Sequence, residues 1–336
     1  MSEQELLYAS ERGDLTRVKK LLDRGVQINC KDQNGRTPLF LASANDHPIV
    51  VQCLVDARAK LDTFDSRGDN PLLRASANGH DNVVKCLVEA RAKLDTFDLD
   101  GNTPLDWASM NGRLAIVKYL VNAGMTLNTP NLLGETPLSY ASSNGHFDVV
   151  QYLIEAKATL ETCDLSGGTP LFWASTNGHP TVVKCLIDTR ATFDTRDLYG
   201  NTPLSSASIN GHDNVVRCLV DARATLDTRD SNEWTPLSWA SHYGHLNIVR
   251  CLVGAGAWIY VCDKNNKTPL DLSSTKQEVR KALMTSNQVW HPAIHSLASK
   301  TTRETIQTIM VIWSCQGCPI KDLSPELLFH IFNFLF

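Results

Sequence analysis

The sequence predicts an all-α protein built as a stack of small repeated units, not a globule around one core. Two observations carry this prediction. A Thr-Pro-Leu tripeptide returns every 33 residues, and apolar residues recur at helical spacing after each copy. The first copy begins at Thr37, and later copies place their prolines at Pro104, Pro137, Pro170, Pro203, Pro236 and Pro269, with Asn70-Pro71-Leu72 in the remaining slot. A fixed period of this length indicates units that bury their apolar faces only against their neighbours.

Each unit is expected to begin with a turn and a short helix, as the unit that starts at Asp65 shows. The Asp65 carboxylate can accept a hydrogen bond from the backbone two residues on, and Gly68 supplies a positive φ. Asn70 and Pro71 then suit the N-cap and the first position of a helix. Gly79 suits a left-handed C-cap. The first helix of this unit is therefore predicted from Pro71 to about residue 78.

A second helix is predicted over residues 82–90, because Val83, Val84 and Leu87 recur at helical spacing. One slot of this helix holds either cysteine or tyrosine in successive units: Cys53, Cys86, Tyr119, Tyr152, Cys185, Cys218 and Cys251. A slot that accepts both residue types is a packing position, and a free cysteine packs as a small hydrophobe. The cysteines therefore favour a reducing compartment. We expect the cytoplasm and leave the nucleus open.

Composition argues against several classes of function. Hydrophobic residues make up 43% of the chain, charged residues 20%, and the net charge is −4 with no basic stripe. These values are normal for a soluble protein and give no support to nucleic-acid binding. The N-terminus shows no secretory signal, and the apolar run 309–313 is too short to span a bilayer. We therefore expect no nucleic-acid partner and no membrane partner.

The turn, the T-P-L-x-x-A helix, the N-G-H turn and the V-V-x-C-L-V helix together resemble the ankyrin repeat. The resemblance covers residues 2–285 and predicts nine units, of which the first lacks Thr-Pro and the ninth is shortened. Such atypical end units suit caps whose outer faces meet water. The resemblance implies an ankyrin-repeat solenoid of helix–turn–helix units with β-turn or hairpin loops, followed by a short helical tail over residues 286–336.

Two features depart from the ankyrin pattern. The histidine that usually follows Thr-Pro-Leu is absent, so the inter-repeat bonding it provides in the family is not expected at that slot. The glycine that usually ends the second helix is also replaced in five units, by Arg58, Arg91, Lys157, Arg190 and Arg223. If these residues keep a left-handed backbone, each costs on the order of 1 kcal/mol. We therefore predict that Arg91→Gly stabilises the protein.

No catalytic or metal site is predicted, and no cofactor. Five histidines share one repeat slot and so belong to the scaffold: His80, His146, His179, His212 and His245. Cys315 and Cys318 form a C-x-x-C pair, but a structural zinc site needs four ligands and no second pair exists. A chance pair or a redox pair is the favoured interpretation. An enzyme that carries ankyrin repeats is the weakest class, because residues 286–336 hold no catalytic set.

Partner-binding residues are expected where the repeats differ from one another. Two columns of the first helix and the turn tips vary, and their prominent members are Trp107, Met110, Leu133, Tyr140, Trp173, Tyr199, Trp234, Trp239 and His242. The ankyrin resemblance implies that first helices and turn tips line a concave groove, where these residues would bind a protein. Tryptophan and tyrosine are enriched in interface hot spots. The alternative is that the aromatic residues pack between repeats.

The end of the chain offers a second candidate site. The segment that begins Leu323-Ser324-Pro325 resembles the first helix of an F-box, and a SOCS box or the ending of viral ankyrin proteins is similar over this length. The resemblance implies docking on an adaptor of a cullin-type ubiquitin ligase through Leu323, Pro325, Glu326, Leu327, Leu328, Ile331, Phe332 and Leu335. The alternative is a helix that only caps the stack.

The function expected from these features is a non-catalytic scaffold that binds a partner protein in its groove. In its sharper form the protein is a substrate receptor, whose repeats select a target while its tail recruits a ubiquitin ligase. The alternative is a plain interaction or inhibitor protein whose tail seals the last repeat.

Overall fold

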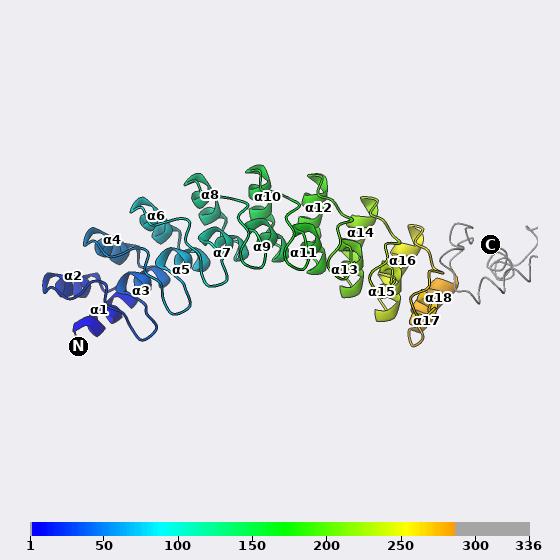
Figure 1. Cartoon of the computed structure of the whole chain (residues 1–336), viewed down its shortest axis with the longest axis horizontal. Coiled ribbons are helices and arrows are strands. Elements are labelled where there is room, and N and C mark those ends of the chain that lie inside the picture. The colour runs from blue at the N-terminus through cyan, green and yellow to red at the C-terminus, as the bar shows by residue number, and fades with distance from the viewer. Residues whose placement is uncertain (1, 286–336) are drawn as a thin grey trace, which may run out of the picture. The chain divides into compact units, whose positions relative to one another are not determined.

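The computed structural model describes residues 2–285 (Figure 1). This range contains eighteen α-helices and no β-strand, which confirms the predicted all-α class. The helices are α1 (Ser2–Glu11), α2 (Leu15–Asp23), α3 (Pro38–Ala44), α4 (Pro48–Asp56), α5 (Pro71–Asn78), α6 (Asp81–Glu89), α7 (Pro104–Met110), α8 (Leu114–Asn122), α9 (Pro137–Ser143), α10 (Phe147–Glu155), α11 (Pro170–Thr176), α12 (Pro180–Asp188), α13 (Pro203–Asn210), α14 (Asp213–Asp221), α15 (Pro236–Tyr243), α16 (Leu246–Gly254), α17 (Pro269–Leu272) and α18 (Gln277–Met284).

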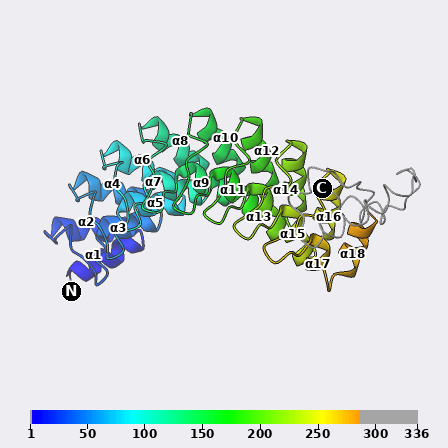
Figure 2. The same cartoon turned by 45° about the vertical axis from the view of Figure 1, so that its right-hand side comes forward.

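The chain divides into two compact units, residues 1–174 and 175–336. In the first unit the first helices of successive repeats, α1, α3, α5, α7 and α9, pack side by side in one layer. The second helices α2, α4, α6, α8 and α10 form a parallel layer beside them (Figure 2). In the second unit α13, α15 and α17 make one layer and α12, α14, α16 and α18 the other. Each repeat therefore contacts its immediate neighbours, as expected of a solenoid.

The first helices begin as the sequence predicts. The Asn70 side chain accepts a hydrogen bond from the backbone N–H of Leu73 at 2.8 Å, so asparagine caps α5 as threonine caps the first helices of the second repeat and of the fourth to ninth repeats. Gly79 ends α5 with a φ of 87°, and the predicted bounds of this helix are confirmed. The following helix, α6, begins and ends one residue earlier than predicted.

The core lies between the two layers and is shared by adjacent repeats. Leu72, Val83, Val84 and Leu87 of the third repeat are at most 1% exposed, and the same columns are buried in the second repeat and in the fourth to eighth repeats. Each such side chain contributes roughly 1.5–3 kcal/mol when fully buried. Because these contacts join one repeat to the next, no repeat holds a core of its own.

The replaced glycines do keep the left-handed backbone. Arg58, Arg91 and Lys157 in the first unit have φ values of 63°, 65° and 70°. Arg190 and Arg223 in the second unit have values of 69° and 64°. The backbone condition on which the expected strain after each of these second helices depends is therefore met. The turn slot behaves in the same way where it lacks glycine, since Glu233 and Asn266 have φ values of 65° and 57°.

The histidine column has the structural role predicted for it. The ring Nε2 of His80 lies 3.0 Å from the carbonyl oxygen of Ala44, one repeat earlier. The His146 ring makes the same contact with Met110 at 2.9 Å, as do His212 with Thr176 and His245 with Ile209. These bonds satisfy carbonyls near the ends of first helices. The histidines before the second helices thus supply inter-repeat bonding that the usual family histidine would otherwise provide.

The described residues place limits on other chemistry. Among the cysteines within residues 2–285, Cys86 is buried, whereas Cys53, Cys185, Cys218 and Cys251 are half-buried. In the same range no group of three or more potential ligands is placed to hold a metal ion. None of the helices in this part of the chain is long and apolar enough to cross a bilayer. The predicted helical tail and the Cys315–Cys318 pair lie outside the described residues.

Candidate functional site

The candidate site is built on the hairpin turns that precede the first helices. In the fourth repeat, Asp98 Oδ1 accepts hydrogen bonds from the backbone N–H groups of Asp100 and Asn102 at 3.0 and 2.8 Å. Neighbouring hairpins are joined by backbone bonds, such as that from Leu132 N to Asp100 O at 3.1 Å. These contacts fix each turn carboxylate beside its own first helix. We call the surface formed by the hairpins and the first helices the hairpin–helix face.

Each tryptophan of the first-helix column in the first unit is tied to the turn carboxylate nine residues earlier. The indole Nε1–H of Trp107 donates to Asp98 Oδ2 at 2.9 Å, and that of Trp173 donates to Asp164 Oδ2 at 2.6 Å. Both side chains are half-buried. The indole rings are therefore held in one orientation before any partner arrives, which lowers the entropy cost of binding.

Tyr140 occupies the same column in the fifth repeat and has a wider network. Its hydroxyl lies 2.5 Å from Glu135 Oε2 and 2.9 Å from Asn102 Oδ1, and it accepts from Asn131 Nδ2 at 2.8 Å. Burial raises the pKa of Tyr140, and the hydrogen bond to Glu135 and the charges of Glu135 and Asp106 raise it further. The hydroxyl is therefore a neutral donor that links the fourth and fifth hairpins.

Asp106 lies at the third position of α7 and is fully buried. Its Oδ2 accepts from the backbone N–H and the hydroxyl of Thr103 at 2.8 and 2.7 Å, which completes a capping box. Its Oδ1 has no hydrogen-bond partner. The pKa of Asp106 is raised to about 7, mainly by burial. The two hydrogen bonds from Thr103 lower this pKa, and the nearby charges of Asp98 and Glu135 raise it.

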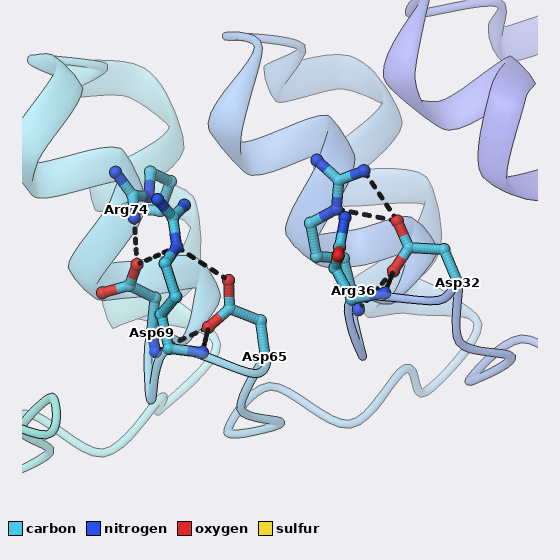
Figure 3. Close-up of polar contacts among 7 residues, drawn as sticks. Asp32, Arg36, Asp65, Asp69 and Arg74 are labelled. Atoms are coloured by element: carbon cyan, nitrogen blue, oxygen red, sulfur yellow. Dashed lines mark hydrogen bonds and ion pairs between the residues drawn. The ribbon is translucent and has the colours of Figure 1, made fainter.

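In the second and third repeats, carboxylates of the hairpin pair with cations instead of indoles (Figure 3). The Arg36 guanidinium pairs with Asp32 Oδ2 at 2.7 Å. In the third repeat Arg74, which occupies the Trp107 column, pairs with Asp69. Arg67 lies 3.8 Å from a carboxylate oxygen of Asp65 as well. Here each carboxylate has a cation from its own repeat, whereas in the fourth and sixth repeats it has a neutral indole.

The second unit carries an aromatic cluster of its own. Trp239 Nε1 donates to Asp230 Oδ2 at 2.9 Å, and Trp234 Nε1 donates to Asp263 Oδ2 at 3.0 Å. The two indole centroids are 4.4 Å apart. His242 extends the cluster, with its ring edge-on to Trp234 at 5.1 Å. This cluster repeats the arrangement of the first unit, in which a turn carboxylate holds each aromatic N–H.

The predicted binding residues are thus placed in two groups. In the first unit Trp107, Met110, Tyr140 and Trp173 are half-buried, and Leu133 is 54% exposed. In the second unit Trp234 and Trp239 are half-buried, while Tyr199 and His242 are exposed. The four tryptophans and Tyr140 are therefore neither free on the surface nor sealed between repeats, whereas Tyr199 is exposed. The eight predicted adaptor-binding residues of the tail lie outside the described residues.

Sequence reasoning missed an exposed leucine column at the hairpin tips. Leu99, Leu132 and Leu165 in the first unit are 70%, 71% and 69% exposed, and Leu198 in the second is 75% exposed. A pocket of about 450 Å³ lies between the fourth and fifth hairpins, and its apolar lining includes Phe97, Leu99, Met125, Pro130 and Leu132. The recurrence of leucine directly after the turn residue Asp or Asn was the signal that could have found this column.

Comparison with known families agrees with this architecture. The model of the family described as "Ankyrin repeats (3 copies)" matches residues 6–98, 93–164, 156–230 and 222–290. These matches cover most of the sequence, so the chain belongs to the ankyrin-repeat family. Such repeats are typically non-catalytic, and they make this protein a scaffold for protein–protein interaction. No curated protein matches the chain.

Proposed function

We propose that this scaffold binds its partner protein on the hairpin–helix face, with Trp107, Tyr140 and Trp173 as anchors in the first unit. The observation that carries the proposal is the hydrogen bond from each aromatic side chain to its own hairpin. Because the indole N–H or the tyrosine hydroxyl already has a hydrogen-bond partner within the chain, a binding protein can cover the aromatic ring without supplying one. Rigid, half-buried aromatic rings of this kind are typical of interface hot spots.

The hairpin tips support the same face as the binding surface. Single exposed apolar residues are normal on a protein surface, but a repeated column of exposed leucines beside an apolar pocket is not. Leu99 and Leu132 both line that pocket and both lie directly after the turn residue. A partner that covers the aromatic rings and reaches the hairpin tips would bury these leucines as well.

The test is affinity capture of the partner with matched variants of the whole chain. Trp107→Ala and Trp173→Ala remove anchors, whereas Lys85→Ala removes an exposed side chain from α6 in the other layer. We expect wild type and Lys85→Ala to retain the same protein. Each tryptophan variant should weaken binding at least about thirtyfold, as for a hot-spot residue. Circular dichroism should show unchanged helix content. Equal binding by a folded tryptophan variant and by wild type would contradict the proposal.

A sharper form of the function is a substrate receptor for a cullin-type ubiquitin ligase. The observation that favours it is the segment from Leu323 to Leu335, which resembles the first helix of an F-box. The test is a pulldown of cullin adaptors with wild type and with a Leu327→Ala, Leu328→Ala double variant. Loss of adaptor in the double variant supports the receptor. Retention of adaptor by the double variant contradicts the receptor hypothesis. Absence of adaptor from both samples favours the plain interaction protein with a capping tail.

The cysteines of the repeats favour the cytoplasm as the location of the protein.

A further inference from the structure

The charge of the hairpin–helix face changes along the first unit. Residues 32–46 carry two carboxylates and one guanidinium group, and residues 65–79 carry two of each. The corresponding segments of the next three repeats, 98–112, 131–145 and 164–174, carry five carboxylates and neither lysine nor arginine. The second and third repeats thus place three guanidinium groups beside four carboxylates, whereas the five carboxylates of the next three repeats have no lysine or arginine in the same segments to balance them.

The contacts explain why this charge is not balanced. In the third repeat the cation of Arg74 lies against Asp69 (Figure 3). In the fourth repeat the same column holds Trp107, which donates a neutral N–H to Asp98. The hydrogen-bonding capacity of Asp98 is therefore satisfied, but its charge is not. In the part of the chain that the structure describes, no ion pair involves Asp98, Asp100, Asp106, Glu135 or Asp164.

A second observation shows that the negative groups are crowded. Asp106 is fully buried, with one carboxylate oxygen unpartnered, and the charges of Asp98 and Glu135 act on it. The charges of Glu135 and Asp106 likewise raise the pKa of Tyr140. These groups come from two successive repeats and converge around Tyr140. Two carboxylates of the region can meet a partner directly, because Asp100 is exposed and Glu135 is half-buried.

We infer that the hairpin–helix face of the fourth and fifth repeats binds a segment of the partner protein that carries arginine or lysine. This inference rests on the proposed function and adds the chemistry of the partner. The partner's cation would lie among the carboxylates of Asp98, Asp100 and Glu135. It would balance their negative charge, as the guanidinium of Arg74 balances that of Asp69 within the third repeat. Contact with an aromatic face would favour the same cation. Complementary charge of this kind determines specificity and association rate.

The column itself offers matched variants. Trp107→Arg supplies an internal cation to Asp98, as Arg74 does to Asp69. Trp107→Leu removes the indole without adding charge, and leucine already occupies this column at Leu41. Arg74→Leu removes one cation from the third repeat and leaves Asp69 with only Arg67, whose Nε lies 3.9 Å from Asp69 Oδ2. Thermal unfolding of all three variants checks that they remain folded.

The probe is a library of random 12-residue peptides displayed on phage and selected on the full chain. We expect the recovered peptides to be enriched in arginine and lysine. For a recovered peptide, fluorescence anisotropy should show binding about three- to tenfold weaker to Trp107→Arg than to Trp107→Leu, the range for a half-buried ion pair. Added salt should weaken binding to wild type more than to Trp107→Arg. Arg74→Leu should bind the basic peptide at least as well as wild type.

Three results would overturn the inference. These are recovered peptides with no surplus of basic residues, equal affinity of Trp107→Arg and Trp107→Leu, and failure of the selection to yield any peptide that depends on Trp107. If neutral peptides bind, and both Trp107→Leu and Trp173→Ala weaken their binding, the proposed binding face is supported and its preference for cations is wrong. If neither tryptophan variant weakens a bound peptide, the proposed face itself is wrong.

Discussion

The left-handed residue after the second helix gives a prediction with a definite sign. Arg91 has a φ of 65° and its side chain is exposed, so neither a core contact nor a described ion pair holds it there. A non-glycine residue in this region costs about 1–2 kcal/mol. Glycine loses about 0.5–1 kcal/mol more backbone entropy on folding. The difference predicts that Arg91→Gly stabilises the protein by about 0.5–1 kcal/mol.

The chain supplies both controls for this substitution. Arg91→Ala removes the side chain but keeps the strain, so it should change stability little. Gly124 occupies the same slot with a φ of 93°, and no atom lies within 4 Å of the position that its Cβ would take. Gly124→Arg therefore adds backbone strain without a clash, and it should destabilise by a similar amount.

Urea unfolding followed by circular dichroism measures all three variants. The expected order of midpoints is Arg91→Gly above wild type, wild type close to Arg91→Ala, and Gly124→Arg lowest. An Arg91→Gly midpoint below that of wild type would refute the strain argument. If Arg91→Ala and Arg91→Gly raise the urea midpoint equally, the gain in stability comes from loss of the arginine side chain and not from relief of backbone strain.

Three further predictions concern the first unit. A Cβ at Gly168 would lie 2.5 Å from Trp173 Nε1, so Gly168→Ala should displace the indole and destabilise the protein by about 1–3 kcal/mol in urea unfolding. Because the pKa of Asp106 is raised to about 7 in the folded protein, this group favours folding at low pH and its contribution declines as pH rises from about 4 to about 7. The stability of Asp106→Asn relative to wild type should therefore increase over that window. His146→Ala removes the inter-repeat bond to Met110 O and should cost about 1–3 kcal/mol by the same assay.

The sequence alone was sufficient for the repeat architecture, because caps, turns and apolar columns agree in the units between the two atypical end units. The N-cap of Asn70 and the C-cap of Gly79 are local features, and both were predicted correctly; the left-handed backbone at Arg91, which the sequence reasoning took as a condition, is present. The turn slots of Glu233 and Asn266 show the limit of this reasoning. Both lack glycine, yet both keep the left-handed backbone, since the hairpin on either side determines it.

The candidate site was only partly accessible to sequence reasoning. The variable aromatic column could be found, but its environment could not, because Trp107 and Asp98 were assigned to different columns and their bond depends on how the hairpin folds back. The unbalanced charge was missed for a similar reason. A net charge of −4 over the whole chain hides the contrast between segment 65–79, which is neutral, and segment 98–112, which carries three carboxylates and no cation.

The central claim is that a partner protein covers the hairpin–helix face. Amide hydrogen exchange of the full chain, measured with and without the captured partner, tests it most directly. The account predicts added protection in the hairpins and in α7 and α9, with little change in α8 and α10 of the other layer. Protection confined to α8 and α10, with the hairpins unchanged, would contradict it.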